Sequence, residues 1–298
     1  MEILQELKQH LPPFALGVMR LGIWLVLLMV IYIPLEKLCA LHPQKVFRKE
    51  FLTDFGYYFI NSFLPKLLLI LPLSMLAWGL HYLVPSGLYA WVADMSLWMR
   101  FMAAMLVGEI GGYWGHRWSH EIPVLWRFHA IHHSAEEIDW LVNTRAHPLD
   151  MVFSRLCCLI PMYALGLAQS TGNTVDVLPL LYAIVGTLWT FFIHANVRWR
   201  FGWLEWLIST PAFHHWHHTN DGPEYVNKNY AAIFPWVDKL FGTFYLPKQR
   251  WPTKYGIDAP MAPGLTGQLL QPFLQREKPS VALVESCSGE RAKPGEAA

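Results

Sequence analysis

Charged residues are scarce in this chain of 298 residues, and their scarcity excludes several protein classes. Lys, Arg, Asp and Glu make up 15% of the sequence, whereas soluble domains contain about a quarter. The formal net charge is +1, which argues against a nucleic-acid partner because such a partner requires a strongly basic face. Of the four cysteines, two are adjacent in an apolar run and one lies in a polar tail. We therefore expect neither a disulfide framework nor a cysteine-based zinc site.

Apolar and aromatic residues are abundant instead. Hydrophobic residues make up 54% of the chain, and the mean hydropathy is +0.25. The 15 tryptophans and 12 tyrosines are also typical of a membrane protein, since their rings favour the bilayer interface. This composition predicts an integral membrane protein.

The chain contains five apolar stretches that are candidates for membrane spans. The first has about the ~20 residues that a bilayer requires, and it lacks a small-residue cleavage site, so we expect an uncleaved anchor. The second contains Pro65, Lys66 and Pro72, which leaves two alternatives, a kinked span or a pair of re-entrant half-helices. We predict an all-α membrane bundle of four to five spans from the stretches 14–34, 55–80, 97–115, 151–168 and 177–195.

The distribution of Lys and Arg predicts the orientation of these spans. Positive residues occur in segments 35–54 and 116–150 and after residue 196, whereas 81–96 and 169–176 contain none. By the positive-inside rule the first set is cytoplasmic. Five spans with the N-terminus outside satisfy this alternation. If the second stretch were re-entrant, there would be four spans and a cytoplasmic N-terminus.

Three regions follow from this organisation. Residues 1–96 form an N-terminal membrane anchor region, and residues 97–250 contain the chemistry-bearing motifs. The tail, 262–298, is polar and rich in Pro, Gly and Ser, so we predict that it is disordered.

Histidine is the residue that packing does not explain. Eleven of the 14 histidines fall between residues 116 and 218, on the side predicted to be cytoplasmic. "HRWSH" places two at i and i+4, and "HAIHH" and "HHWHH" repeat the spacing H-x-x-H-H, so each motif presents rings on one helical face. One more lies at the end of the fifth apolar stretch. The nine residues are His116, His120, His129, His132, His133, His194, His214, His217 and His218.

This spacing indicates a metal site. Neutral imidazole binds Fe, Cu, Ni and Zn, and rings at i, i+3 and i+4 converge on one ion. Nine rings are more than one metal ion can bind, so the pattern predicts two metals. Metal sites that keep an open coordination position are typical of catalysis. His147 in "TRAHPLD" is a candidate tenth ligand or a structural residue. The remaining histidines, His215 among them, lack a spacing partner and are expected in surface or interfacial positions (His10, His42, His81 and His215).

Glu109 extends the constellation. It precedes His116 by seven residues and therefore lies on the same helical face. An acidic residue within a span is costly and usually has a partner. Glu109 is thus expected to orient a ligand histidine, or else to pair with Arg117 or a tryptophan N–H.

In order and spacing, "HRWSH", "HAIHH" and "HHWHH" resemble the three histidine boxes of the fatty acid hydroxylase/sterol desaturase superfamily. "GEIGGYWGHRWSH", "RAHPLD" and "NYAAIFPWVDKLFGTFY" also resemble segments of that family, with Ala231 where the family has glycine. The resemblance covers roughly residues 100–247.

The resemblance implies a membrane enzyme whose cytoplasmic histidine cap holds two irons, with the nine histidines as ligands. It implies O2-dependent hydroxylation or desaturation of a lipid, sterol or fatty acyl, at an unactivated C–H bond. The chain has no cytochrome b5 module and no "HPGG" motif. Electrons would therefore come from a separate carrier of the cytochrome b5 or ferredoxin type.

Two other functions use the same histidines. A membrane zinc metallohydrolase would need a carboxylate base, for which Glu136, Glu137 and Asp139 are candidates. A non-catalytic metal transporter or sensor is the second, although transporters hold their ligands near the bilayer midplane. Metal content and O2 dependence discriminate among the three.

Overall fold

A computed structural model describes residues 11–168 and 177–274. Within them the regular structure is helical, with two isolated β-bridges, Ala40–Val197 and Thr219–Tyr255, and no strand. The long helices are α2 (Pro13–Cys39), α3 (Phe51–Leu83), α5 (Leu97–Glu121), α7 (Pro148–Ala164) and α8 (Leu178–His194). The short ones are α4 (Ser86–Ala93), α6 (Pro123–His133), η1 (Trp140–Thr144), η2 (Gly202–Trp206), α9 (Pro211–His217), α10 (Pro235–Leu240) and α11 (Gly264–Leu274).

Two helices, α2 and α3, are long and apolar enough to cross a membrane. Only 11% of the most apolar window of each is buried, so their hydrophobic side chains face outward, as lipid-exposed helices require. α8 contains a shorter apolar segment, Leu180–His194. α3 is one continuous helix that includes Pro65 and Pro72, so the alternative of two re-entrant half-helices is wrong.

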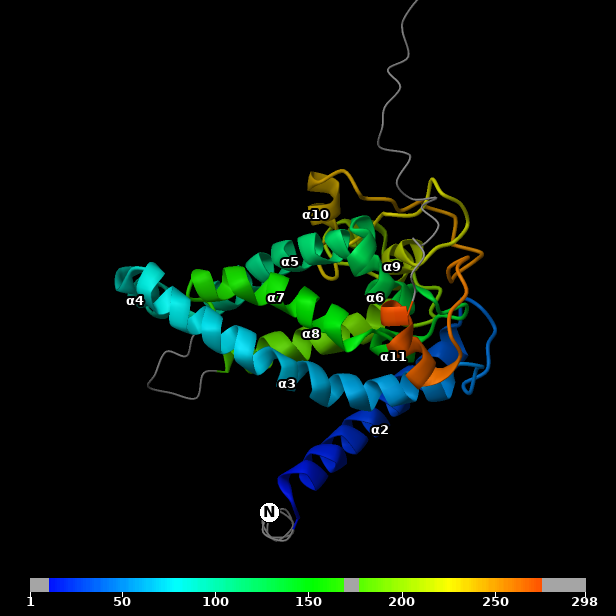
Figure 1. Cartoon of the computed structure of the whole chain (residues 1–298). Coiled ribbons are helices and arrows are strands. Elements are labelled where there is room, and N and C mark those ends of the chain that lie inside the picture. Colours follow the sequence, from blue (N-terminus) through cyan, green and yellow to red (C-terminus); the bar gives the residue numbers. More distant parts are fainter. Residues whose placement is uncertain (1–10, 169–176, 275–298) are drawn as a thin grey trace, which may run out of the picture.

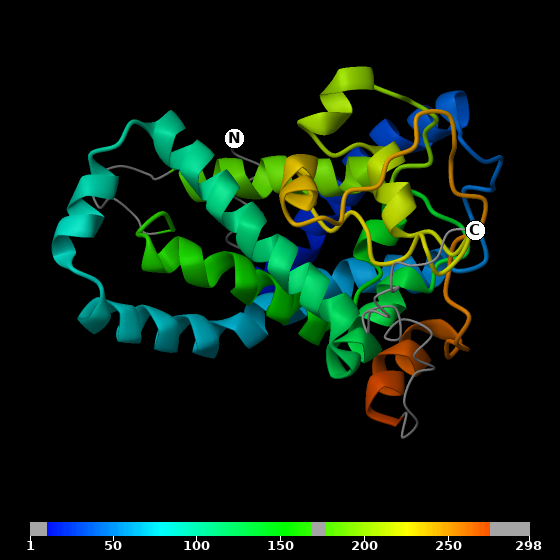
Figure 2. The same ribbon diagram turned by 90° about the horizontal axis from the view of Figure 1, so that it is seen from above.

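Small residues bring α5 and α7 into close contact, and the two helices lie side by side (Figures 1 and 2). A Cβ on Gly111 would collide with the Cys157 carbonyl, and one on Gly115 would lie 2.8 Å from Cys157 Cβ. Glycine at these positions therefore lets the two backbones approach closely. The contact places the end of α5, with His116 and His120, beside the start of α7.

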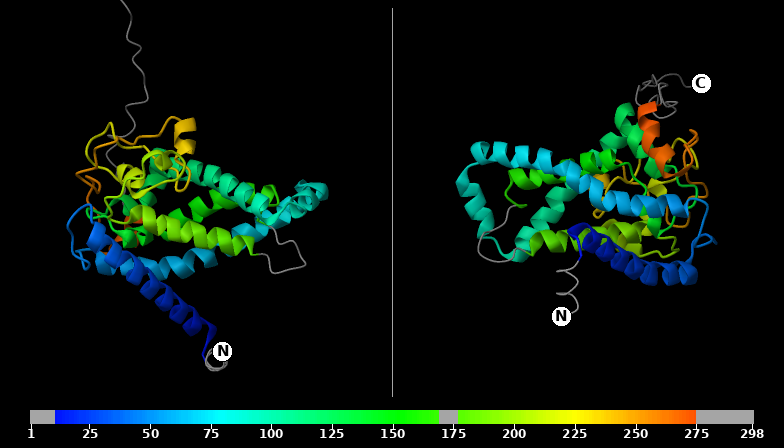
Figure 3. Two further views of the ribbon diagram at one scale, coloured as in Figure 1. Left: turned by 180° about the vertical axis from the view of Figure 1, so that it is seen from behind. Right: turned by 60° about the horizontal axis from the view of Figure 1, so that its bottom comes forward.

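The short helices α6, η1 and α9 form a cap at one end of the bundle (Figures 1 and 3). At this end α2, α5 and α8 finish, and α3 and α7 begin. The loops predicted to be cytoplasmic therefore gather on one side. Backbone hydrogen bonds from Leu41 to Asn196 and from Arg198 to Cys39 join the loop after α2 to the loop after α8.

A buried ion-pair network attaches the cap to α3. Arg48 donates to both carboxylate oxygens of Asp139, at 2.8 and 2.7 Å, and it also pairs with Asp54. Arg145 Nε donates to Asp54 Oδ1 at 2.6 Å. All four side chains are buried, so each charge depends on the others for its compensation. Asn61 Nδ2 also donates to the carbonyls of Thr144, the last residue of η1, and Ala146.

α11 corrects the expectation that the tail from 262 is disordered. Residues 264–274 form a helix, because Leu265 packs against Gly56 of α3 and Phe273 contacts Phe128 of α6. The sequence there is apolar at intervals that suit one helical face, which the Pro/Gly content concealed. Residues 275–298 lie outside the described residues.

Candidate metal centre

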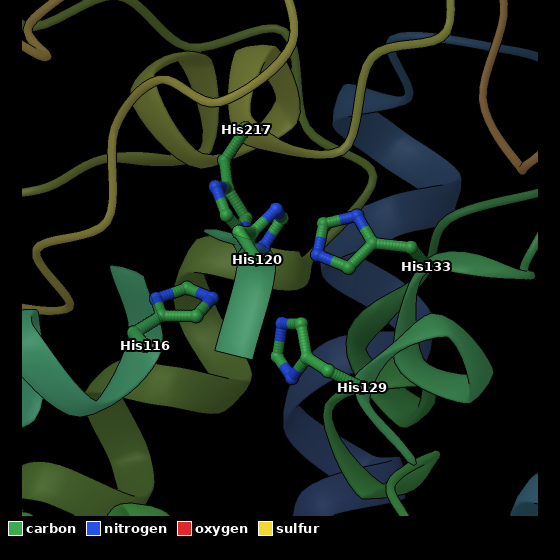
Figure 4. A group of neighbouring side chains, drawn as sticks. All are labelled: His116, His120, His129, His133 and His217. Carbon is green, nitrogen blue, oxygen red and sulfur yellow. The ribbon is translucent and has the colours of Figure 1, made fainter. Parts of the chain in front are cut away.

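The nine histidines converge in two groups. His116 and His120 of α5, His129 and His133 of α6 and His217 of α9 form the first group (Figure 4). The second group contains His132, His194, His214 and His218. Within each group the candidate ligand atoms lie within 4.8 Å of one another. Both groups are therefore able to bind a metal ion.

The two H-x-x-H-H motifs each contribute to both groups. In α6, the i and i+4 residues His129 and His133 join the first group, and His132 joins the second. In α9 the arrangement is reversed, because the i and i+4 residues His214 and His218 join the second group and His217 joins the first. The groups adjoin one another, and the His133 and His218 ring centroids are 4.4 Å apart.

Hydrogen bonds fix the tautomers of two rings in the second group, His132 and His194. The Nδ1 of His132 contacts the Arg145 carbonyl at 2.9 Å, and the Nδ1 of His194 contacts the Thr190 carbonyl at 2.7 Å. A carbonyl can only accept, so in both rings the proton is on Nδ1 and Nε2 presents a lone pair. These two Nε2 atoms nevertheless lie 3.2 Å apart. Facing lone pairs repel, and a shared cation removes the repulsion; two nitrogens on one ion lie roughly 3–3.5 Å apart.

The first group shows the same pattern. The Nδ1 atoms of His116 and His217 donate to the carbonyls of Tyr230 and Lys228, and that of His129 donates to Asp150. Such outer partners orient metal ligands in proteins. Four ring nitrogens remain buried without a hydrogen-bond partner, the Nε2 atoms of His120, His129, His133 and His217. A polar atom buried in this way is costly unless a ligand satisfies it, so the donor set fits a metal ion.

Burial keeps these rings in the form that binds metal. Apart from His116, which is partly buried, every one of the nine is at most 8% exposed. Burial, reinforced by the neighbouring imidazoles, lowers the pKa of five of these rings well below the ordinary value, so they are neutral at pH 7; they are His132, His133, His214, His217 and His218. A neutral ring is the ligand form.

His147 lies outside both groups. Its Nδ1 accepts a hydrogen bond from the Leu149 amide at the start of α7, and its Nε2 donates to the Leu269 carbonyl of α11. Both ring nitrogens are thus used in joining α7 to α11. The geometry supports the structural alternative and not the tenth ligand.

His215 is also outside both groups, as its helical face predicted, but it is not at the surface. The side chain is fully buried. Its Nε2 donates to the Ala195 carbonyl at 3.1 Å, and its Nδ1 accepts from the Tyr255 hydroxyl at 2.8 Å. The expectation of a surface or interfacial role was wrong because spacing identifies the ligand face but says nothing about what covers the opposite face. His215 fixes α9 to the end of α8.

Glu109 was assigned the wrong partners. Its Oε1 accepts hydrogen bonds from the backbone amides of Ile233 and Phe234, at 2.7 and 2.9 Å. It therefore anchors the segment before α10 to α5 and does not orient a histidine. Sequence reasoning also missed Asp150, which orients His129 and accepts from Ser119. The signal was present in "HPLD", where an acidic residue opens a helix.

The carboxylates considered as hydrolytic bases are engaged or exposed. Asp139 pairs with Arg48 and accepts hydrogen bonds from the Leu141 and Val142 amides at the start of η1. Glu136 and Glu137 are exposed at the surface.

Residues 101–243, which include all nine histidines, match the family model described as fatty acid hydroxylase. Over these residues the chain is similar to the fatty acid hydroxylase family. It is 34% identical over 192 residues to ornithine lipid hydroxylase OlsE of Rhizobium tropici, covering 64% of this chain and 55% of that protein. The chain is also 30% identical over 168 residues to human alkylglycerol monooxygenase, and these residues cover 53% of this chain and 33% of that protein.

A third relative is the Delta(7)-sterol 5(6)-desaturase erg3C of Aspergillus fumigatus. It is 31% identical over 185 residues, which cover 55% of this chain and 54% of that protein. The chain thus spans about half of the length of OlsE and of the sterol desaturase, and about a third of the length of alkylglycerol monooxygenase. No solved structure matches it.

Proposed function

We propose that this chain is an O2-dependent di-iron membrane oxidoreductase that acts on a C–H bond of a lipid. The observation that carries the proposal is the pair of adjoining histidine groups, whose Nε2 atoms face one another in buried surroundings. The nine histidines would hold the two irons, and the irons would supply the activation of O2 and the removal of hydrogen.

The protein's own residues prepare the site. Carbonyls of Tyr230, Arg145, Thr190 and Lys228 hold the Nδ1 protons of four rings, which keeps the Nε2 atoms directed at the groups. Asp150 does the same for His129 and increases the basicity of that ring. Burial of the rings excludes water, so that competing reactions with solvent are suppressed.

The membrane arrangement is part of the proposal. The continuity of α3 favours five spans over four, formed by α2, α3, α5, α7 and α8. Because the Lys- and Arg-containing loops gather at the cap, the positive-inside rule favours a cytoplasmic histidine centre and an N-terminus outside. A lipid would then approach the cap from the bilayer, between the helices.

The relatives support hydroxylation of a polar membrane lipid. OlsE is named for ornithine lipid and its match extends over 64% of this chain, and alkylglycerol monooxygenase is also an oxygen-inserting enzyme by name. We therefore propose oxygen insertion, with amino-acid-containing membrane lipids as the first class to test. Electrons would come from a separate cytochrome b5-like or ferredoxin-type carrier.

The competing hydrolase is less well supported. A zinc hydrolase requires a carboxylate base beside the metal, but Asp139 is held by Arg48 and Asp150 by His129. Both carboxylates therefore already have a structural partner.

The decisive experiment compares lipid mass profiles of cells with and without the protein, with and without O2, together with the metal content of the purified chain. A gain of about 16 mass units on a lipid, dependent on O2 and accompanied by two irons per chain, supports the proposal. A loss of about 2 units would establish desaturation instead. Activity with zinc alone and without O2 would overturn the redox function.

A further inference from the structure

A polar cavity of about 380 Å³ lies beside the candidate metal centre, and no step of the proposed reaction uses it. The loop that precedes α3 and the segment after α6, with Arg145, form part of its wall, and residues 257–263 with Gln268 of α11 form the rest. Its volume is within the range of small-molecule sites, roughly 300–1,000 Å³. Arg145, which lines it, is the residue whose carbonyl orients His132.

Three buried polar atoms of the wall have no hydrogen-bond partner. They are Arg145 Nη2, Glu50 Oε2 and Gln268 Oε1. Arg145 and Gln268 are 1% and 2% exposed, so neither is an ordinary surface group. Arg145 Nη2 and Glu50 Oε2 are 3.7 Å apart, too far for a hydrogen bond. The side chains around the cavity therefore hold one donor and two acceptors without a hydrogen-bond partner, and a polar ligand would satisfy them once these side chains turn toward it.

The charge of the wall favours a cationic group in the ligand. The two arginines, Arg48 and Arg145, are compensated by Asp54 and Asp139. Of the remaining charges, Lys254 compensates Asp258, which leaves the carboxylates of Glu50, Glu136 and Glu137 against the single ammonium of Lys49. An ammonium group that donates hydrogen bonds suits Glu50 and Gln268, and an anionic oxygen suits Arg145 Nη2.

The position of the cavity relates it to the membrane surface. Glu50 directly precedes α3, and Leu52 and Phe55, within the first turns of that helix, are 79% and 37% exposed. On the other wall, Gln268 is followed by Leu270 and Phe273, which are 51% and 61% exposed. Both walls change from polar to outward-facing apolar residues within a few positions. This change is characteristic of the level of lipid headgroups.

We propose that this cavity binds the zwitterionic, primary-amine headgroup of the lipid substrate. The ammonium contacts Glu50 and Gln268, and the anionic oxygen of the headgroup contacts Arg145. The substrate assignment rests on the proposed function, whereas the binding of the headgroup does not. A free amine such as ornithine offers the same chemistry without acyl chains. The test therefore compares a lipid headgroup with the free amine as the ligand.

The experiment measures lipid binding to the purified full-length protein in detergent by native mass spectrometry. The probes are lipids with identical acyl chains and ethanolamine, choline or glycerol headgroups, with free ornithine as the soluble arm. The ethanolamine lipid should bind about tenfold more tightly than the choline lipid, whose quaternary nitrogen cannot donate. Glu50→Gln and Gln268→Leu should each remove that preference, whereas Glu224→Gln, an exposed charge change outside the cavity, should retain it.

Equal binding of ethanolamine and choline lipids, or an unchanged preference in both cavity variants, would overturn the proposal. Free ornithine that competes at the concentrations of the lipid would overturn the lipid assignment. If binding behaves as expected and the loaded enzyme oxidises an amine lipid, Glu50→Gln should raise KM several-fold with little change in kcat and in iron content. Headgroup preference without any oxidation of the lipid would contradict the proposed function while leaving the binding site intact.

Discussion

The helical bundle and the cap are built on opposite principles. In α2 and α3 the apolar side chains face outward and few residues are buried. In the cap and the helix ends that meet it, the buried residues include arginines, aspartates and eight of the nine histidines of the two groups. The lipid-facing helices depend on apolar surface, whereas the cap depends on charge compensation and on ligands. Polar substitutions should therefore have their main effects in the cap, and insertion into the membrane should be independent of them.

The largest effect is expected from His217→Ala. It removes a ring nitrogen from the first group, so iron content should fall and turnover should drop by at least about 100-fold. His132→Ala should do the same through the second group. Iron analysis and lipid turnover are the measurements, and membrane fractionation should be unchanged. His81→Ala is the matched control, because His81 is exposed on α3; a similar loss there would refute the comparison.

Acid should destabilise the cap before the bundle. Burial lowers the pKa of His133 and His218, so these rings stay neutral in the folded protein but take up protons near pH 6.5 once unfolded. Above about pH 6.5 these rings do not reduce the free energy of unfolding. Below that pH the free energy of unfolding falls, because the unfolded chain binds protons that the folded chain does not. Each such histidine lowers the free energy of unfolding by about 1.4 kcal/mol for each pH unit below that point. Iron release and the thermal midpoint, followed from pH 7.5 to 5, test this, and a flat profile would contradict it.

Arg145→Met should weaken the attachment of the cap to α3. The substitution keeps much of the side-chain volume but leaves Asp54 with Arg48 as its remaining ion-pair partner. Loss of one member of a buried network costs about 3–5 kcal/mol. Thermal unfolding in detergent and proteolysis between η1 and α7 should both show the loss. Arg250→Met, at an exposed arginine, is the control and should change the thermal midpoint little.

His215→Ala should have the smallest of these effects and should separate stability from ligation. The variant loses two hydrogen bonds and leaves a cavity, at a cost of about 2–4 kcal/mol. Iron content should stay near that of the native protein, and turnover should fall much less than in His217→Ala. Loss of iron equal to that of His217→Ala would show that His215 contributes directly to the centre.

The sequence predicted the site more fully than the packing around it. Because helical spacing is local, the motifs identified eight of the nine rings that the structure brings together and excluded His215, and the ninth, His194, was identified by its place at the end of an apolar stretch. The division into two groups depends on how α6 and α9 face one another, which no spacing within a motif contains. The network of Arg48, Asp54, Asp139 and Arg145 joins residues some ninety positions apart, so it was not predictable.

The errors on Glu109 and on α11 have a shared physical origin. Glu109 and α11 were interpreted from their own composition, whereas their roles come from partners distant in the sequence. Backbone amides near residue 233 satisfy the Glu109 carboxylate, and α3 and α6 supply the apolar contacts that stabilise α11. Neither partner is visible from the segment itself.

The crossed contribution of α6 and α9 has a consequence for how the centre is assembled. Each helix holds rings of both groups, so an ion in one group also restrains the helix that carries ligands for the other. The second ion then meets rings whose ordering entropy has already been lost. Metal loading should therefore be cooperative: chains with no ion and chains with two should be common during titration, and chains with one should be rare.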